Sequence, residues 1–449
     1  MKRGGDGWRT VATLALIVSL GFAIRFTIWI YPMYGVQSLL IFDTGSYPIF
    51  GLAYIHAITT MNFTALTSIN PGVPPIGMLL TGLSTQTFGE LIGPIQASLI
   101  PPVTASALTA IPAYLIAKRY AGRAALLAPA LVSFDPFLIQ FSATYLDSIG
   151  TLFAAASAAY VIDSSSRRSF SLAIFFATLA ALTKLSFTIF TAIFALLLLL
   201  NKELTARRAI LYLLIPPASL VLSPGVWRPS NIGAIVEGHL AFNNVPLAPL
   251  LSPFVIDVPL SLPWHILSYL GMGQVSWNTL PHVTPLAVLL MVAYQAARNE
   301  LRIPRGAAIP ASAIVLAIFL LPRGYWTYSW AGGAVQGVLA RQFYPYYFYP
   351  VGPFLAVLAA AVFASDAGHR PAGRLATYPA LLAALVSPLA VVMSFGLPYW
   401  DFIFNLIYSA SQGSWMAEGI AAAGITTAIL AAVLAAAELI HRRAQRIGG

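Results

Sequence analysis

Long apolar segments alternate with shorter polar ones along most of the chain, a pattern typical of a protein that crosses a membrane many times. A spanning helix needs roughly 20 mainly apolar residues, and about twelve segments have this character. They lie near residues 10–30, 93–117, 124–141, 146–163, 169–184, 186–200, 209–224, 281–297, 307–321, 346–365, 377–396 and 417–440. The pattern predicts an all-α integral membrane protein in which residues 1–449 form one polytopic domain. The first segment lacks a small-residue cleavage site, so we expect a retained helix rather than a signal peptide.

Two stretches between segments are much longer than the others, at about 31–92 and 225–280, and both are rich in Pro, Trp, Tyr and Asn. Long connections in compact proteins are usually functional or disordered. Their many aromatic and aliphatic residues argue against disorder. We expect both stretches to form amphipathic helices that lie on the outer leaflet, cover a cavity and make up the active-site face. No separate soluble domain is expected.

The composition supports a membrane location. Of the 449 residues, 59% are hydrophobic and 8% are charged, whereas soluble domains carry about 25% charged residues. Charged residues this scarce cannot cover the surface of a water-soluble protein. We therefore expect most of the surface of this chain to face lipid. The sequence contains no cysteine, which excludes disulfides and thiol chemistry.

The basic residues follow a topological pattern. With the N-terminus placed in the cytoplasm, 19 of the 24 Lys and Arg residues fall in inside loops, as the positive-inside rule requires. They are Lys2, Arg3, Arg9, Lys118, Arg119, Arg123, Arg167, Arg168, Lys202, Arg207, Arg208, Arg298, Arg302, Arg305, Arg370, Arg374, Arg442, Arg443 and Arg446. This distribution predicts a multi-pass plasma-membrane protein. It also explains the net charge of +10 without a nucleic-acid partner.

The other charged residues gather on the outer side. The five remaining cations all fall at or beyond the outer ends of segments, and eight carboxylates fall on the same side. These residues are Arg25, Lys184, Arg228, Arg323 and Arg341, with Asp43, Glu90, Asp135, Asp147, Glu237, Asp257, Asp401 and Glu418. Because topology does not require these charges, we expect the functional site on the outer, extracellular face.

Four of the outer residues form a candidate site. Asp43 follows the first segment, Asp147 opens the fourth, Lys184 lies in the turn between the fifth and sixth, and Arg341 precedes the tenth. A carboxylate with several cations is the set that transfer from a sugar phosphate needs. Lys and Arg can hold the donor phosphate, and a carboxylate can take the proton of an acceptor hydroxyl.

Each of these residues also has a purely structural interpretation. Asp43 is explained as a turn or cap carboxylate, and Asp147 as the cap of the helix that it opens. Lys184 is explained as a lysine that snorkels to the interface. Arg341 heads an aromatic run and is explained by stacking on tyrosine. The shared depth of all four is stronger evidence than any one of them.

Other residues on the outer side complete the candidate set. Arg25 and His239 are candidate substrate-binding residues, although the outer histidines are explained more simply as hydrogen-bonded structural groups. No histidine pair has metal-ligand spacing, and we expect no cofactor. The alternative to a protein without a cofactor is a site for one divalent cation formed by Asp43 and Asp147.

Six motifs together resemble one family. The sequence is similar to the GT-C membrane glycosyltransferases that use polyprenyl-phosphate sugars, and within them to the protein O-mannosyltransferase and aminoarabinose-transferase group of archaeal type. The resemblance covers roughly residues 10–365. It is carried by "FDTGSYP", "NPGVPPIGMLL", "ATYLDSIGTLF", "LTKLSFTIF", the pair "LSPGVWRPSNIGAIVEGHLAFNN" and "LSLPWHILSYL", and "RQFYPYYFYPVGPFLAVLAA".

The resemblance implies a fold, a reaction and roles. The fold would be GT-C, with about twelve helices and an external site. The reaction would move a sugar, with mannose on dolichyl phosphate as the first choice, to a hydroxyl of a protein, glycan or lipid with inversion. Asp43 would be the catalytic base, Lys184 and Arg341 the phosphate ligands, and Asp147 would shape the acceptor side. Tyr47 matches the family's tyrosine after the acidic residue and would contact substrate.

The sequence departs from the family in places that leave two alternatives open. Val73 stands where a His or Lys usually precedes the Pro-Pro pair, and Thr44 stands where a second carboxylate often follows Asp43. A non-catalytic subunit that kept the fold is therefore one alternative. A secondary transporter is the other, although the segment middles are almost free of the ionisable residues that transporters carry.

Overall fold

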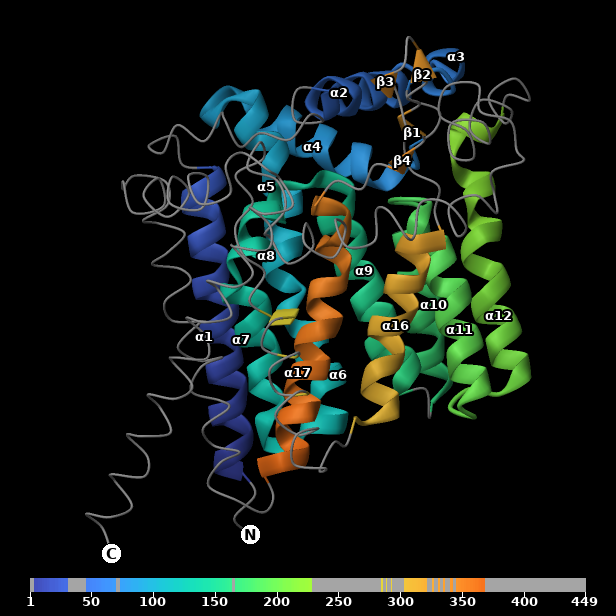
Figure 1. Cartoon of the computed structure of the whole chain (residues 1–449). Helices are drawn as coiled ribbons and strands as arrows, with labels where there is room; N and C mark the ends of the chain where they lie inside the picture. The colour runs from blue at the N-terminus through green and yellow to red at the C-terminus, as the bar shows by residue number, and fades with distance from the viewer. Residues whose placement is uncertain are drawn as a thin grey trace, which may run out of the picture.

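The computed structural model describes residues 4–30, 46–69, 73–163, 166–227, 303–320 and 345–367, with 284–285, 288, 292, 325–326, 330–331, 334–335 and 340–341. Over these ranges the chain is a bundle of helices with further helices lying across one end (Figure 1). Strand structure in the same ranges consists of four two-residue pieces. β1 (Tyr325–Trp326) pairs antiparallel with β4 (Ala340–Arg341), and β2 (Trp330–Ala331) with β3 (Ala334–Val335). The predicted helical membrane fold is confirmed.

The helices of the bundle coincide with the predicted apolar segments. They are α1 (Gly4–Trp29), α5 (Pro94–Leu108), α6 (Ala110–Ala121), α7 (Leu127–Phe134), α9 (Tyr145–Ile162), α10 (Arg167–Ala181), α11 (Ser186–Leu200), α12 (Ala206–Ala218), α16 (Arg305–Leu320) and α17 (Gly352–Ala367). Shorter pieces join them: η4 (Gly122–Leu126), α8 (Pro136–Gln140), η5 (Phe141–Ala143), η6 (Ser219–Leu222), η7 (Pro224–Trp227) and η11 (Pro345–Val351). The segments predicted at 377–396 and 417–440 lie outside the described residues, as does most of 281–297.

Three helical stretches in the described part are long and apolar enough to cross a membrane: Gly7–Trp29, Pro94–Ala121 and Tyr145–Ile162. A bent pair, Ala124–Phe134 with Phe137–Ala143, is a fourth if it is taken as one span. Several shorter helices, such as Ser186–Leu200, are also apolar. These spans and the fold support a membrane location, while the predicted count of about twelve stays a prediction.

The predicted segment 124–141 is divided into two helical stretches. Ala124–Phe134 and Phe137–Ala143 are bent by 52° relative to each other. The break falls at Pro136, and a proline supplies no N–H group to a continuing helix. Asp135 then starts a new helix, and its side chain accepts hydrogen bonds from the backbone N–H groups of Phe137 and Leu138.

Small and aromatic side chains form the interior of the bundle. α9 packs along α10, and the buried residues of both helices include many alanines, such as Ala158 and Ala177. Small residues allow helix backbones to approach closely, which is how helices associate in lipid. Gly150 of α9 faces the ring of Phe187 of α11, which would collide with any side chain at that position.

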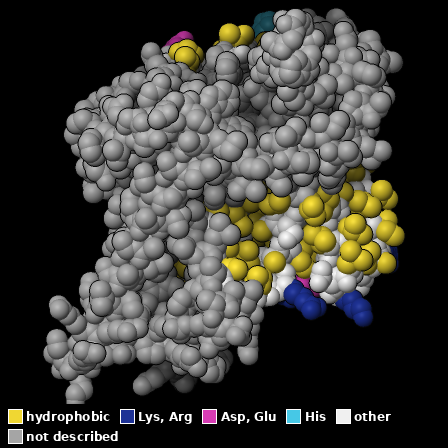
Figure 2. All heavy atoms as spheres, viewed as in Figure 1, with side chains coloured by type: hydrophobic (Ala, Val, Ile, Leu, Met, Phe, Trp, Pro, Cys, Tyr) yellow, Lys and Arg dark blue, Asp and Glu magenta, His cyan; other side chains and the backbone are white. Residues whose placement is uncertain are grey.

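The basic residues and the apolar flank agree with a membrane bundle. Lys118 and Arg119 lie in the last turn of α6, and Arg119 donates to the carbonyl of Ile162 at the end of α9, 2.7 Å away. α12 starts at the same end with Arg207 and exposes apolar residues such as Leu214 along its length. Figure 2 shows hydrophobic side chains over the described flank, with Lys and Arg at its lower rim.

The first long stretch forms the helices that lie across the other end of the bundle (Figure 1). They are α2 (Ser46–Thr59), the short α3 (Phe63–Leu66) and α4 (Pro75–Ile92). α2 crosses α4 at Gly51 and Gly82, where the two backbones touch: a Cβ added to Gly51 would lie 2.6 Å from the amide nitrogen of Gly82. The contact fixes α2 on α4. Beyond residue 227, the second long stretch lies outside the described residues.

Replacing Gly51 with alanine should loosen this end of the molecule. The new methyl group would meet backbone atoms of α4, which cannot turn aside as a side chain can. We expect the free energy of unfolding to fall by about 1–3 kcal/mol, the usual cost of overpacking. Thermal unfolding of the purified protein in detergent measures it. Gly7→Ala is the matched control, because nothing lies within 4 Å of a Cβ there. Equal melting temperatures for the two variants would contradict the prediction.

Candidate active site

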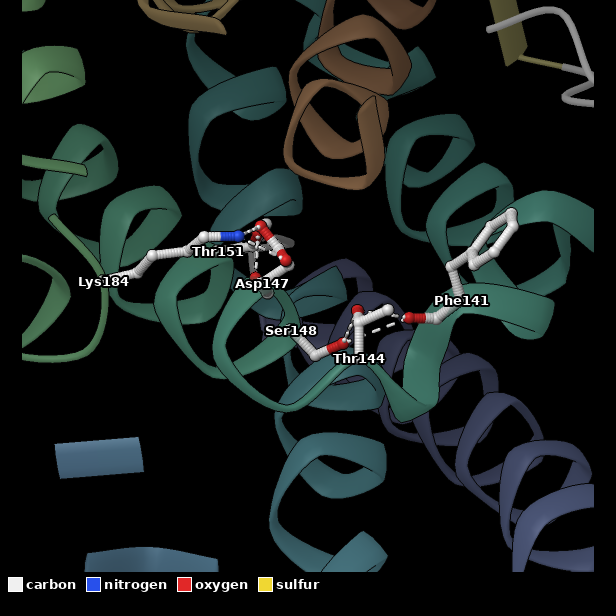
Figure 3. Close-up of polar contacts among 6 residues, drawn as sticks. All are labelled: Phe141, Thr144, Asp147, Ser148, Thr151 and Lys184. Carbon is white, nitrogen blue, oxygen red and sulfur yellow. Dashed lines mark hydrogen bonds and ion pairs between the residues drawn. The ribbon is translucent and has the colours of Figure 1, made fainter. Parts of the chain in front are cut away.

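The start of α9 is held by a set of local hydrogen bonds. Thr144, the residue before the helix, donates its hydroxyl to the carbonyl of Phe141 at 2.6 Å. The Ser148 hydroxyl donates to the carbonyl of Ser142 at 2.9 Å, and these contacts fold η5 against the first turn of α9 (Figure 3). Asp147 lies within that first turn, so the capping position belongs to Thr144 and not to Asp147. The helix dipole still favours a negative charge there.

Asp147 and Lys184 form an ion pair across two elements. Lys184 lies in the turn between α10 and α11, and its side chain points toward the start of α9 (Figure 3). Its Nζ donates to both carboxylate oxygens of Asp147, each at 2.6 Å. The Asp147 side chain is 5% exposed and that of Lys184 is 19% exposed. The lysine therefore meets a buried carboxylate instead of reaching into the interface, and its side chain stays partly exposed.

α4 lies directly against this pair. The backbone N–H of Ile76, in the first turn of α4, donates to the carbonyl of Leu182 at 3.0 Å. Gly77 faces the side chains of Leu146 and Thr183, the neighbours of the two charged residues. The helix begins with the Pro-Pro pair that the sequence analysis singled out, because proline suits the first helical position. The "NPGVPPIGMLL" motif thus ends beside Asp147 and Lys184.

α2 brings Tyr47 to the same place. The ring of Tyr47 stacks on that of Tyr145, with centroids 4.9 Å apart and planes 17° apart. Tyr145 lies two residues before Asp147, and its hydroxyl shares a hydrogen bond of 2.8 Å with the hydroxyl of Ser98 in α5. Tyr47 is buried by this stack. Of the predicted residues, Asp147 and Lys184 therefore contact each other directly, and Tyr47 contacts Tyr145 in the same turn of α9.

Other predicted residues are described only in part or not at all. Asp43 and His239 lie outside the described residues. The backbone of Arg341 lies in β4, opposite Tyr325 in β1, at the end of the bundle where α2 and α4 are found (Figure 1). Nothing is described of the Arg341 side chain. The grouping of all four charged residues in one cavity stays a prediction.

Arg25, one of the predicted substrate-binding residues, lies inside the bundle. Its side chain is fully buried. Its Nε donates to the hydroxyl of Ser106 at 2.8 Å, and its Nη1 to the carbonyl of Gly21 at 3.1 Å. Nη1 and Nη2 also donate to the carbonyls of Ser133 and Val132, both at 2.7 Å. These bonds give Arg25 a structural role between α1, α5 and α7.

Asp135 is likewise a structural carboxylate. Besides capping α8, it accepts hydrogen bonds from the backbone N–H and the hydroxyl of Thr284, at 2.8 and 2.7 Å. Asp135 thus holds Thr284 beside the break between α7 and α8. Sequence reasoning had placed both Asp135 and Arg25 among the outer charges. Their position inside apolar segments was the available signal for buried partners.

The structure adds Tyr349, a residue that the sequence analysis did not single out. Tyr349 lies in η11 and is 1% exposed. Its hydroxyl donates to Ser106 at 2.6 Å, and η11 packs against α9, the helix that carries Asp147. The hydroxyl oxygen of Ser106 thus accepts hydrogen bonds from both Arg25 and Tyr349. The aromatic run "YPYYFYP" was the signal, but it does not tell which tyrosine is buried.

The described residues hold no group of three or more His, Cys, Asp or Glu that could bind a metal ion. Asp147 is one of the two carboxylates considered as ligands of a divalent cation. In the structure both of its carboxylate oxygens accept hydrogen bonds from the Nζ of Lys184. The ion pair supplies a cation at this position from the chain itself.

Substitutions of Asp147 and Lys184 should lower the stability of the protein non-additively, because both break the same ion pair. In Asp147→Asn the charge of Lys184 loses its carboxylate, and in Lys184→Met the buried carboxylate loses its cation. We expect each change to lower the free energy of unfolding by about 1–3 kcal/mol. The double variant should lose less than the sum, by roughly 0.5–3 kcal/mol, because the pair is broken only once. Unfolding titrations of the four proteins in detergent measure this; strictly additive losses would exclude the coupling.

Part of the chain matches a known family, and the fold resembles that of a solved structure. Residues 72–227, which carry α4, Asp147 and Lys184, match the family of dolichyl-phosphate-mannose-protein mannosyltransferases. The structure resembles that of ArnT from Cupriavidus metallidurans with bound undecaprenyl phosphate, with a TM-score of 0.51 and 15% identity over 97% of this chain and 78% of that chain.

A second solved structure is less similar to this chain. The archaeal oligosaccharyltransferase AglB from Archaeoglobus fulgidus, in complex with an inhibitory peptide and a dolichol-phosphate, gives a TM-score of 0.41 and 14% identity over 93% of this chain and 56% of that chain. No curated protein sequence gives a significant match. The chain is therefore a membrane protein with the GT-C fold that resembles, over residues 72–227, the dolichyl-phosphate-mannose-protein mannosyltransferases.

Proposed function

We propose that this chain transfers a sugar from a polyprenyl-phosphate donor to a hydroxyl acceptor on the outer face of the membrane, with mannose on dolichyl phosphate as the first donor to test. One observation carries the proposal. A partly exposed cation, Lys184, is held by a buried carboxylate at one end of an apolar bundle. Both residues lie within the region that matches the mannosyltransferase family.

Lys184 fits the role of a donor-phosphate ligand. Asp147 fixes the position of its ammonium group, which costs less entropy than ordering a mobile lysine when the donor binds. Arg341 is the proposed second ligand, since a guanidinium matches the oxygens of a phosphate. The leaving phosphate gains negative charge as the sugar bond breaks, so cations next to it contribute most in the transition state.

Asp43 is the proposed catalytic base. It precedes Tyr47 by four residues, and four residues of chain span at most about 14 Å. Tyr47 itself stacks on Tyr145, two residues from Asp147. The Asp43 carboxylate is therefore within reach of the Lys184 end of the bundle. Asp147 is already neutralised by Lys184, so it is less suited to remove a proton and is left to shape the acceptor side.

The proposed reaction is a single displacement. An acceptor hydroxyl oxygen attacks the anomeric carbon of the donor and forms the new glycosidic bond. The bond between that carbon and the phosphate oxygen breaks, and its electron pair leaves with the polyprenyl phosphate. The hydroxyl proton passes to Asp43. Attack opposite to the leaving group inverts the anomeric configuration.

The orientation in the membrane follows from the basic residues. We propose that the end carrying Lys118, Arg119 and Arg207 faces the cytoplasm, by the positive-inside rule. The N-terminus would lie on the same side. Lys184 and the helices α2 and α4 would then lie at the outer face, where the phosphate of a lipid-borne donor is found.

The experiment that tests the function uses the purified wild-type protein in liposomes. Dolichyl phosphate carrying radiolabelled mannose is supplied with membrane proteins and glycolipids as acceptors, and label in each class is counted. Undecaprenyl phosphate mannose and dolichyl phosphate glucose test the donor. We expect transfer from at least one donor, at equal rates with and without EDTA because the proposed phosphate ligands are side chains. Binding of donor without transfer to any acceptor would favour a non-catalytic subunit and overturn the proposal.

A further inference from the structure

The break between α7 and α8 creates unsatisfied backbone groups inside the bundle. A helix leaves its last carbonyls and its first N–H groups without partners, and in a membrane protein each such group is costly. The helices are bent by 52° at Asp135, within a predicted spanning segment. These groups are the carbonyls of Val132 and Ser133 on one side and the N–H groups of Phe137 and Leu138 on the other.

Two residues of opposite charge supply hydrogen-bond partners to the backbone groups at the break. Arg25 reaches from α1 and donates to the carbonyls of Val132 and Ser133, at the negative end of the α7 dipole. Asp135 accepts from the N–H groups of Phe137 and Leu138, at the positive end of the α8 dipole. The break is therefore a polar junction, in which each charge compensates one helix end.

The junction extends to the proposed active site through two hydroxyls. Arg25 donates to Ser106 at 2.8 Å, and the same oxygen accepts from Tyr349 at 2.6 Å. η11, which carries Tyr349, packs against α9. Tyr349 follows Arg341 by eight residues on the segment that enters α17. The Ser106 hydroxyl thus connects the broken helix to η11, which packs on α9 and follows Arg341 in the chain.

We propose that Arg25, Ser106 and Tyr349 are positioning residues that hold η11 in place against α9, and so set where Arg341 lies relative to Lys184. The proposal rests on the proposed function for its catalytic consequence. Its structural part does not, because the contacts exist whatever the reaction. A tyrosine hydroxyl that only stabilised the bundle would change stability alone. A positioning hydroxyl should also change how the donor phosphate is bound.

The chain contains a matched control for this distinction. Tyr212 of α12 is also fully buried, and its hydroxyl shares a hydrogen bond with the hydroxyl of Ser157 in α9. The pair has the chemistry of Tyr349 and Ser106 but lies toward the basic half of the bundle. Tyr212→Phe and Tyr349→Phe each remove one buried hydroxyl and leave the ring in place.

Hydrogen exchange followed by mass spectrometry tests the structural part. In Tyr349→Phe we expect peptides covering residues 136–148 and 345–351 to exchange about two- to tenfold faster, the factor that corresponds to one lost hydrogen bond. Ser106→Ala should affect the same peptides, because it breaks the link from the other side. Tyr212→Phe should leave them unchanged and speed exchange in α12. Unchanged exchange in both regions of Tyr349→Phe and Ser106→Ala would overturn the proposal.

Steady-state transfer tests the catalytic part. We expect Tyr349→Phe to raise KM for the polyprenyl-phosphate donor about two- to tenfold with a smaller change in kcat, and Tyr212→Phe to leave both constants unchanged. An active wild type whose donor KM is the same in Tyr349→Phe would overturn the positioning role. If the wild type transfers no sugar, the proposed function fails, and the exchange experiment still decides whether the junction fixes η11 on α9.

Discussion

Asp43→Asn should lower the rate of sugar transfer by about 10²- to 10⁴-fold, the usual contribution of a general base. Asparagine has nearly the same shape as aspartate but cannot accept the proton of an attacking hydroxyl at neutral pH. Donor binding should be nearly unchanged, because the phosphate is assigned to Lys184 and Arg341. The measurement is the initial rate of transfer in liposomes, with donor binding measured separately by displacement of labelled polyprenyl phosphate.

The control for this variant is Asp163→Asn. Asp163 ends α9 at the opposite end of the bundle, where it is exposed to solvent. The Asp163→Asn substitution removes one negative charge far from the proposed site. The transfer rate of this variant should therefore equal that of the wild type. If Asp43→Asn keeps more than half of the wild-type rate at equal protein levels, the base is another group, and Asp147 becomes the next carboxylate to test.

Lys184→Met should lower transfer by roughly 10²- to 10³-fold, the range found when one group that stabilises transition-state charge is removed. Methionine keeps much of the length and apolar stem of lysine but loses the ammonium group that meets Asp147. The variant also leaves the carboxylate unpaired next to the donor phosphate, and two like charges repel each other. Donor affinity should therefore fall together with the rate, in contrast to Asp43→Asn.

Lys118→Met is the matched control for the lysine. Lys118 lies in the last turn of α6 at the basic end, where its side chain is exposed. The double variant Asp147→Asn with Lys184→Met adds a second comparison. It removes the unpaired carboxylate, so it should recover part of the donor affinity but not the rate. Full activity in Lys184→Met would remove this residue from the donor site and leave the ion pair with a structural role only.

The segments and their ends were predictable because they depend on local properties. Apolar length predicts a spanning helix, and proline or charge predicts where it ends. The start of α9 at Tyr145 and the turn that carries Lys184 were therefore expected from the chain alone. The break at Asp135 was not expected, although Pro136 was visible, because a proline in an apolar segment can also begin a helix or only bend it.

The partners of charged residues could not be predicted from the sequence. Arg25 and Lys184 look alike along the chain, since each is a lone cation near the outer end of an apolar segment. Arg25 donates to Ser106 and to two carbonyls of α7, about 80 to 110 residues away in the chain. Lys184 instead meets a carboxylate, and its side chain is 19% exposed. Only the packing of the helices decides which cation is enclosed.

The sequence by itself determined that this protein is a helical membrane protein and where most of the described helices lie. These features follow from the cost of exposing polar groups to lipid, which acts on each segment separately. The tertiary structure decided that Asp147 pairs with Lys184, that α4 and Tyr47 close against them, and that Arg25 and Asp135 hold a broken helix. Those contacts join residues far apart in the chain, and their energy exists only once the helices are packed.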